Sequence, residues 1–337
     1  MTTDTSQPDD GTAPYVPFRV NDRPRVCWDP ELQRKNLAFI RGVDSTYYEH
    51  VADVHSQHLD GDAKLQAAAA LRIAHSQGLE TLLALLCATM QAPDCVIGWM
   101  LSYRSTDLQA MVEAVSSGDQ RNVLPIFRPA TWQSMAALVH SGTHWPSDKD
   151  TEIQEGFGRL WSRLARDYAD ERNRQEYNAL KHGTRPALGG FTFALGRQSA
   201  PNVPAPPEAM RSMGGSEFGS TFYVVEPLSD HRLHFQPKRV SRNWVPANLV
   251  YGLRLLAMSI GNVTSFLRIV NGDTPESCRF EAPTDEGGFD KPWAELCGVN
   301  SMTMDLSIRP DSVVVPRDQI LAMLEARYLG PEPTPSS

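Results

Sequence analysis

The stretch TEIQEGFGRLWSRLARDYADERNRQEYNALKHG, residues 151–183, decides the fold that this sequence predicts. Its apolar side chains recur at steps of three and four, the period of one face of an α-helix; they are Ile153, Phe157, Leu160, Leu164 and Tyr168. Thr151 as N-cap with Gln154 three residues later forms a capping-box pattern, and Gly183 is a typical helix terminator. The pattern predicts one long helix over residues 151–182 that is buried along one stripe.

The same stripe turns polar towards the end of this helix. Continuing the steps of three and four reaches Glu171, Gln175, Asn178 and His182. Asn178 and His182 are therefore expected one turn apart on the buried side of the helix. A polar cluster on a core-facing stripe is costly unless it is paired or used, so the sequence predicts a functional site here. The alternative is structural, because Lys181 and His182 also suit the negative end of the helix dipole.

Helical patterning continues on both sides of this stretch. Residues 63–91 are apolar on nearly all sides in their second half, which indicates the central helix of the core. A second apolar seam, residues 249–270, is long enough to pack along the 151–182 helix. We therefore predict a mainly α protein, a helical bundle with a small antiparallel β-meander inserted at about residues 190–240. The strand-like segments are residues 191–195, 221–226 and 231–236.

The predicted domain organisation is a single helical domain over residues 26–329. The chain has 337 residues, of which 41% are hydrophobic, and this composition suits a packed globular protein. Residues 1–25 are polar and rich in Asp, Thr and Pro, so we expect a disordered N-terminal tail there. A second disordered tail is expected over residues 330–337.

Composition argues against several classes of function. The formal net charge of −8 argues against a broadly basic surface for unspecific nucleic-acid binding. The five cysteines show no C-x-x-C spacing, so neither a zinc site nor a disulfide framework is predicted. The sequence shows no signal-peptide pattern, and its most apolar segment, residues 79–90, is too short to span a bilayer. We expect a soluble, cytoplasmic protein with no membrane partner, and no cofactor is predicted because phosphate loops and dinucleotide fingerprints are absent from the sequence.

The end of the predicted helix, Tyr177-Asn178-Ala179-Leu180-Lys181-His182-Gly183, resembles the hallmark of the HEPN family. HEPN proteins are small helical bundles of prokaryotic defence and toxin systems. Their motif is an arginine, a polar residue that is often asparagine, a short gap and a histidine. Asn178, His182 and Gly183 match this pattern, whereas Tyr177 stands at the arginine position. The similarity covers one helix end and its helical partners, less than a third of the chain.

The resemblance implies a function that involves RNA. Enzymes of this family cleave RNA with the 2′-hydroxyl as nucleophile, and they often build the site across a two-fold dimer. By resemblance, His182 would act as acid or base beside Asn178, and the chain would form a homodimer. An arginine would hold the phosphate, but Tyr177 carries no positive charge. Arg174, about one turn earlier, and Arg185, just beyond the helix, are the candidate replacements, and neither stands at the family's spacing.

We therefore prefer the hypothesis of a binding module to that of an enzyme. This HEPN-like module would take RNA or a protein partner through the polar end of the 151–182 helix. Its binding residues would be Tyr177, Lys181 and Arg185. Lys181 and Arg185 belong to a local basic patch with Arg172 and Arg174. The alternative is a metal-independent endoribonuclease of a defence or toxin system, and its catalytic residues would be His182, Asn178 and Arg174.

A third hypothesis is a metal-binding helical bundle. His55 and His58 share a helix face, and His50 is three residues from Asp53. Imidazole and carboxylate groups at these offsets are what a metal site in a bundle would use. A bridged pair would need a matching motif on another helix, and the sequence shows none. The structural alternative is a polar helix end with surface histidines, and the preferred interpretation assigns no metal ligands.

Overall fold

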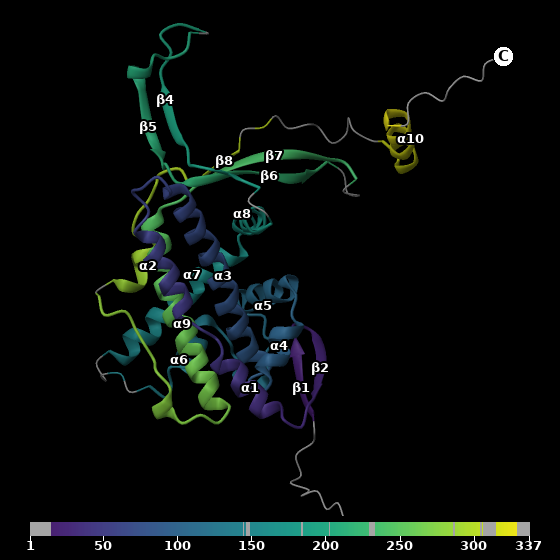
Figure 1. Ribbon diagram of the computed structural model, residues 1–337, viewed down its shortest axis with the longest axis vertical. Helices are drawn as coiled ribbons and strands as arrows, with labels where there is room; N and C mark the ends of the chain where they lie inside the picture. Colours follow the sequence, from purple (N-terminus) through teal and green to yellow (C-terminus); the bar gives the residue numbers. More distant parts are fainter. Residues whose placement is uncertain are drawn as a thin grey trace, which may run out of the picture. The chain divides into compact units, whose positions relative to one another are not determined.

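The structure is a computed structural model that describes residues 15–143, 145, 149–182, 185–201, 203–228, 233–285, 287–303, 305 and 315–328. Its contacts divide the chain into two compact units (Figure 1). The helical unit comprises residues 1–181 and 245–296, and the β unit comprises residues 182–244 and 297–337. The sequence predicts a single helical domain with an insertion at about residues 190–240, whereas residues 182–244 group with residues 297–337 in a compact unit of their own.

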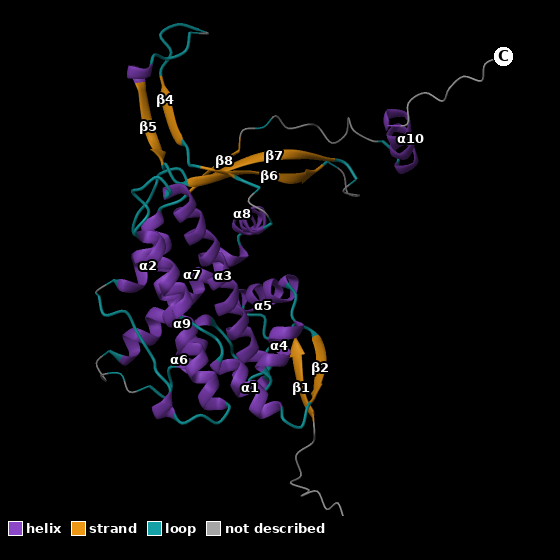
Figure 2. Ribbon diagram, viewed as in Figure 1, coloured by secondary structure: helices purple, strands orange, loops and turns teal. Residues whose placement is uncertain are grey.

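Helices make up the helical unit, apart from one β-hairpin (Figure 2). The predicted mainly α fold class is confirmed. The helices are α1 Leu32–Arg41, α2 Thr46–Ser56, α3 Lys64–Gln91, α4 Val96–Ser102, α5 Ser105–Ser117, α6 Trp132–Val139, α7 Asp150–Ala169, α8 Glu171–Lys181 and α9 Pro246–Val270, with short 3-10 turns η1 Pro125–Phe127, η3 Pro275–Ser277 and η4 Gly288–Trp293.

The core helix is α3, as the sequence predicts. Its second half is buried on every side, because apolar residues fill almost all of its positions. α9 packs along α3 and α2 (Figure 1), and Gly78 allows this close approach, since a Cβ there would lie 3.0 Å from Leu256 Cδ1. The main partner of α9 is thus α3 rather than the predicted 151–182 helix. That helix reaches α9 through Trp161, whose Nε1 donates to Ser259 Oγ at 3.1 Å.

α9 is also the one described helix that is long and apolar enough to cross a bilayer. Within the structure, 61% of its most apolar window is buried. A core helix passes the same test of length and composition, and the packing of α9 on α3 and α2 accounts for its apolar surface.

The N-terminal region forms a hairpin where the sequence predicts a tail. Strands β1 Tyr15–Val20 and β2 Arg23–Trp28 pair antiparallel in a register that places Tyr15 opposite Trp28. Phe18 and Val20 are buried, and β1 contacts α3 and α4. Residues 15–25 of the predicted tail are therefore structured, because alternate apolar side chains of β1 reach the core. Residues 1–14 and 330–337 lie outside the described residues.

The β unit contains the predicted antiparallel insertion, with different strand boundaries. A four-stranded sheet has the order β3-β6-β7-β8, and β4 pairs with β5 as a separate hairpin. The predicted strand over residues 231–236 starts too early, since β7 begins at Phe235, and residues 231–232 lie outside the described residues. The elements are β3 Ala187–Leu188, β4 Thr192–Gly196, η2 Pro207–Ala209, β5 Met210–Gly215, β6 Gly219–Pro227, β7 Phe235–Asn243, β8 Ser301–Thr303 and α10 Arg317–Tyr328.

The predicted 151–182 helix is two helices, and Asp170 separates them. Asp170 has extended backbone angles, φ −63° and ψ 117°, and its Oδ1 accepts hydrogen bonds from the N–H groups of Arg172 at 2.8 Å and Asn173 at 3.2 Å. Asp170 therefore caps the start of α8 instead of continuing α7. Because one non-helical residue changes the rotational phase, the apolar stripe of α7 does not carry over into α8.

A buried ion pair attaches α8 to the core helix α3. Arg72 donates from Nε and Nη2 to Glu176 Oε2, at 2.9 Å and 2.8 Å. Arg72 Nη2 also donates to Asn173 Oδ1 at 2.8 Å. The Glu176 side chain is fully buried and that of Arg72 is 9% exposed. Buried charges require such partners, so this ion pair fixes which face of α8 meets the core.

We predict that Glu176→Ala lowers the free energy of unfolding by about 3–5 kcal/mol, because it leaves Arg72 buried without its carboxylate. Replacing both residues with apolar ones, Arg72→Met with Glu176→Leu, is expected to cost much less than the single change. Urea unfolding of the wild type, Glu176→Ala and the double variant measures these free energies. Glu171→Ala, at an exposed position of the same helix, is the control. A Glu176→Ala variant as stable as this control would contradict the structural role of the pair.

Candidate functional site

α8 presents its predicted functional residues to solvent rather than to the core. Glu176, Ala179 and Leu180 are buried, whereas Asn178 and His182 are exposed. Neither the Asn178 side chain nor the His182 ring makes a hydrogen bond with another described residue. The expectation that these two side chains point inward is therefore wrong, and the break at Asp170 is the physical reason. Gly183 lies outside the described residues.

Three exposed side chains of α8 lie on one helix face, which we call the α8 stripe: Arg174, Asn178 and Lys181. Their spacing of four and three residues places them on one helix face. The exposed Glu171, three residues before Arg174, lies on the same face. Arg174 Nη1 donates to Gln109 Oε1 of α5, and its Nη2 lies 3.8 Å from Glu171 Oε1. Lys181 Nζ lies 4.8 Å from the ring centroid of Tyr177, a cation–π contact. Arg185 and His182 are exposed residues of the β unit.

Tyr177 belongs to a group of half-buried tyrosines beside Glu80 of α3. Burial raises the pKa of Tyr177, Tyr103 and Tyr168 above the usual value, and the nearby Glu80 carboxylate adds to the effect. The Tyr103 hydroxyl donates to Glu80 Oε1 at 3.3 Å. These phenols stay neutral at physiological pH, so Tyr177 serves as a packing residue. It does not supply the positive charge that the arginine of the HEPN motif would provide.

A wider basic feature lies on α7, on the side away from its apolar stripe. The end of α5, the start of α6 and α7 enclose a groove of about 730 Å³, which we call the arginine groove. Three arginines at steps of four and three, Arg159, Arg163 and Arg166, lie along α7 within it. The remaining lining residues are uncharged: Val115, Ser116, Ser117, Gly118, Thr131, Trp132, Gln133, Gly158 and Ser162.

The arginines of the groove are only partly neutralised. Arg163 Nη1 lies 2.6 Å from Asp290 Oδ1 of η4, and its guanidinium lies 5.0 Å from the ring centroid of Trp293. Arg159 is 3.7 Å from Glu155, and both side chains are more than half exposed, so this pair contributes little. Arg166 Nε donates to the Ser162 carbonyl at 3.4 Å and has no carboxylate partner among the described residues. The groove is therefore a local region of positive potential on a chain of net negative charge.

The predicted histidine cluster does not assemble into a metal site. His50 and His58 are exposed and His55 is half-buried along and just after α2. Across the described parts of the chain, no group of three or more His, Cys, Asp or Glu side chains is arranged to hold a metal ion. Burial, followed by repulsion from His58, lowers the pKa of His55.

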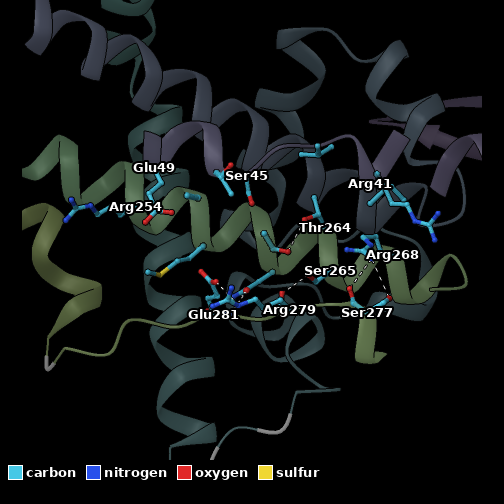
Figure 3. A pocket seen from close by; sticks show the side chains of 17 residues that line it. Arg41, Ser45, Glu49, Arg254, Thr264, Ser265, Arg268, Ser277, Arg279 and Glu281 are labelled. Carbon is cyan, nitrogen blue, oxygen red and sulfur yellow. Dashed lines mark hydrogen bonds and ion pairs between the residues drawn. The ribbon is translucent and has the colours of Figure 1, made fainter. Parts of the chain in front are cut away.

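A second cavity lies beside α9, close to the start of α2 (Figure 3). Its volume is about 420 Å³, and most of the side chains that line it are polar or charged. Four arginines and two glutamates line it, and they come from α1, α2, α9 and the segment after η3: Arg41, Arg254, Arg268, Arg279, Glu49 and Glu281.

His75, one turn after Arg72 on α3, is a buried histidine that the sequence did not single out. Its side chain faces Gly252 of α9, where a Cβ would lie 2.9 Å from His75 Nε2. Its Nδ1 is buried and has no hydrogen-bond partner among the described residues. Burial, with repulsion from Arg72, lowers the pKa of His75 to about 3. The ring is therefore neutral in the folded protein.

We predict that His75 makes the fold less stable in acid. Its folded-state pKa lies below that of the unfolded chain, about 6.5, so the unfolded state binds the extra proton as the pH falls between these values. Stability is expected to drop by up to about 1.4 kcal/mol per pH unit from this residue in that window. Unfolding curves between pH 7 and pH 4 for the wild type and for His75→Gln measure how much of the loss of stability comes from His75. Parallel pH profiles would contradict a buried neutral imidazole.

Comparison with known proteins supplies no relative: no protein-family model, no curated protein and no solved structure matches the chain. The HEPN resemblance therefore rests on the motif at the end of α8 alone.

The sequence contained one signal for the arginine groove. Arg159, Arg163 and Arg166 follow the same steps of four and three as the apolar stripe of the helix, but on its opposite face. The α9 cavity had no such signal, because its arginines are far apart in the sequence and only the fold brings them together.

Proposed function

We propose that the helical unit is an RNA-binding module that holds an RNA phosphate backbone in the arginine groove. The observation that carries this proposal is the row of three arginines on α7 in a groove whose described lining residues include no carboxylate. Guanidinium groups bind phosphates through two parallel hydrogen bonds and keep their charge at any physiological pH. Consecutive arginines on one helix face can contact consecutive phosphates of one strand.

The α8 stripe supports the same proposal as a second contact region. Residues 115–118 at the end of α5 line the arginine groove, and Gln109, earlier in α5, accepts the hydrogen bond from Arg174. One helix thus borders both basic regions. The RNA strand would be held by Arg159, Arg163 and Arg166 and extend towards Arg174 and Lys181. This keeps the predicted binding role of α8 but moves the main contact to α7.

RNA fits the groove better than a protein partner does. Protein interfaces depend on exposed aromatic or large apolar anchors surrounded by polar groups. The large apolar side chains of the groove, Val115 and Trp132, are 3% and 5% exposed and belong to the core. What the groove offers to a ligand is positive charge and hydroxyl groups, which suit a phosphate backbone.

A binding role is favoured over RNA cleavage by the surroundings of His182. A histidine acting as acid or base works together with a group that orients it and a cation that stabilises the transition state. The exposed His182 has no hydrogen-bonded partner among the described residues, and Tyr177 replaces the arginine.

We predict that the protein binds a short fluorescent single-stranded RNA and that Arg159→Gln, Arg163→Gln and Arg166→Gln together weaken binding at least tenfold. The logarithm of the binding constant should fall with the logarithm of salt concentration, by ~0.7 per phosphate contact. Losing three contacts should make this slope shallower by about 2. Fluorescence anisotropy over a salt series measures both effects.

The matched control removes the same charge elsewhere on the helical unit. Arg25, Arg34 and Arg121 are exposed and lie outside the groove, so changing all three to Gln should leave the affinity for RNA almost unchanged. Equal loss of binding in both triple variants, or no RNA binding by wild type, would refute the proposal. If the wild-type protein shortens the RNA and His182→Ala abolishes this cleavage, the function is that of an endoribonuclease rather than of a binding module.

A further inference from the structure

The α9 cavity is lined by polar groups that the proposed RNA contact does not use. Its floor is α9, one wall is the start of α2, and the opposite wall is residues 277–281 (Figure 3). Arg41, Arg268 and Ser277 lie at one end, and Glu49 and Arg254 lie at the other. A volume of about 420 Å³ is in the range of small-molecule sites.

One end of the cavity carries excess positive charge. Asp273 accepts from Arg268 Nε at 2.7 Å and also from Arg41, so two guanidinium groups share one carboxylate. The hydrogen bonds from Arg41 and then Arg268 lower the pKa of Asp273 to about 2, and it stays ionised. Arg268 also donates from Nη2 to the Ser277 carbonyl at 3.1 Å, which fixes the direction of its guanidinium.

Arg279 adds a further cation at the cavity mouth. Its Nε lies 3.0 Å from Glu281 Oε1, and its side chain is 87% exposed. Among the six charged residues that line the cavity, four are arginines and two are glutamates. Arg254, at the other end, lies 2.9 Å from Asp53 Oδ1, so the surplus of positive charge is confined to the end with Arg41 and Arg268. That end is suited to an anion, and a phosphate group matches the donor geometry of guanidinium.

The rest of the cavity offers hydroxyl and carboxylate groups but no aromatic ring. Ser45 Oγ makes no hydrogen bond to another described residue, and it faces Gly261, where a Cβ would lie 3.2 Å away. Glu49 and Glu281 supply carboxylate oxygens, which accept hydrogen bonds from hydroxyl groups. Because no described aromatic side chain lines the cavity, it has no platform on which a nucleobase could stack.

We propose that the α9 cavity is a binding site for a sugar phosphate. Arg268 and Arg279 would hold the phosphate, and Glu49, Glu281 and Ser45 would bind the sugar hydroxyls. The absence of a side chain at Gly261 leaves the floor of the cavity open for the sugar. This site is separate from the arginine groove, since the two share no lining residue.

The test is isothermal titration of the full chain with ribose 5-phosphate, ribose, inorganic phosphate and adenosine monophosphate. We expect ribose 5-phosphate to bind, at least tenfold tighter than inorganic phosphate, and ribose to show no binding. Adenosine monophosphate should bind no more tightly than ribose 5-phosphate. No binding of ribose 5-phosphate, or equal affinity for inorganic phosphate, would refute a sugar-phosphate site. Tighter binding of adenosine monophosphate would also refute it, in favour of a nucleotide site.

Two variants locate the binding. Arg279→Gln changes an exposed side chain and should keep the fold while reducing the affinity at least tenfold. Gly261→Leu should fill the floor and abolish binding; a thermal melt shows whether it remains folded, and Arg279→Gln decides the outcome if it does not. Arg34→Gln, on α1 outside the cavity, is the matched control. Unchanged affinity in Arg279→Gln would overturn the assignment.

The two proposals can fail independently. The triple variant at Arg159, Arg163 and Arg166 should bind ribose 5-phosphate as wild type does, because none of these residues lines the α9 cavity. Loss of ribose 5-phosphate binding in that variant would place the ligand in the arginine groove and overturn the separate site.

Discussion

The buried ion pair between Arg72 and Glu176 determines how α8 meets the rest of the helical unit. A carboxylate with no exposure to water is tolerated only beside a partner, so Glu176 has to face Arg72 on α3. Successive residues of a helix are rotated by about 100°. Arg174, Asn178 and Lys181 therefore lie roughly opposite Glu176 and point into solvent. The direction of every candidate side chain on α8 follows from this one contact.

That direction changes the meaning of the motif at the end of α8. An asparagine and a histidine turned inward would form a small enclosed site, whereas outward side chains belong to a surface. The helical unit has positive charge at two places along α5, at the arginine groove and at Arg174. A surface of this kind binds an extended anion through several weak contacts, each sensitive to salt. The tyrosines beside Glu80 complete the core behind it.

The sequence predicted what depends on local periodicity. The apolar stripe of α7, the central position of α3 and the antiparallel insertion could all be derived from spacing and composition. The prediction that the buried stripe continues from α7 to His182 was wrong because Asp170 is a capping residue, and one non-helical residue rotates every side chain that follows it. The sequence did carry a signal for this break, since an aspartate directly before Glu171 is a typical start of a helix. The Arg72–Glu176 pair and the α9 cavity could not be predicted, since each joins segments far apart in the chain and depends on the packing of α3, α8 and α9.

The rotational phase of α8 determines which of its side chains reach solvent, and thiol labelling measures that phase most directly. Asn178→Cys and Ala179→Cys would be alkylated in the native protein, with rates followed by peptide-resolved mass spectrometry so that the natural cysteines do not interfere. We expect fast modification at position 178, close to the rate in denaturant, and strong protection at position 179. Protection at position 178 with fast modification at position 179 would show that the amide and imidazole point inward, and would contradict the account.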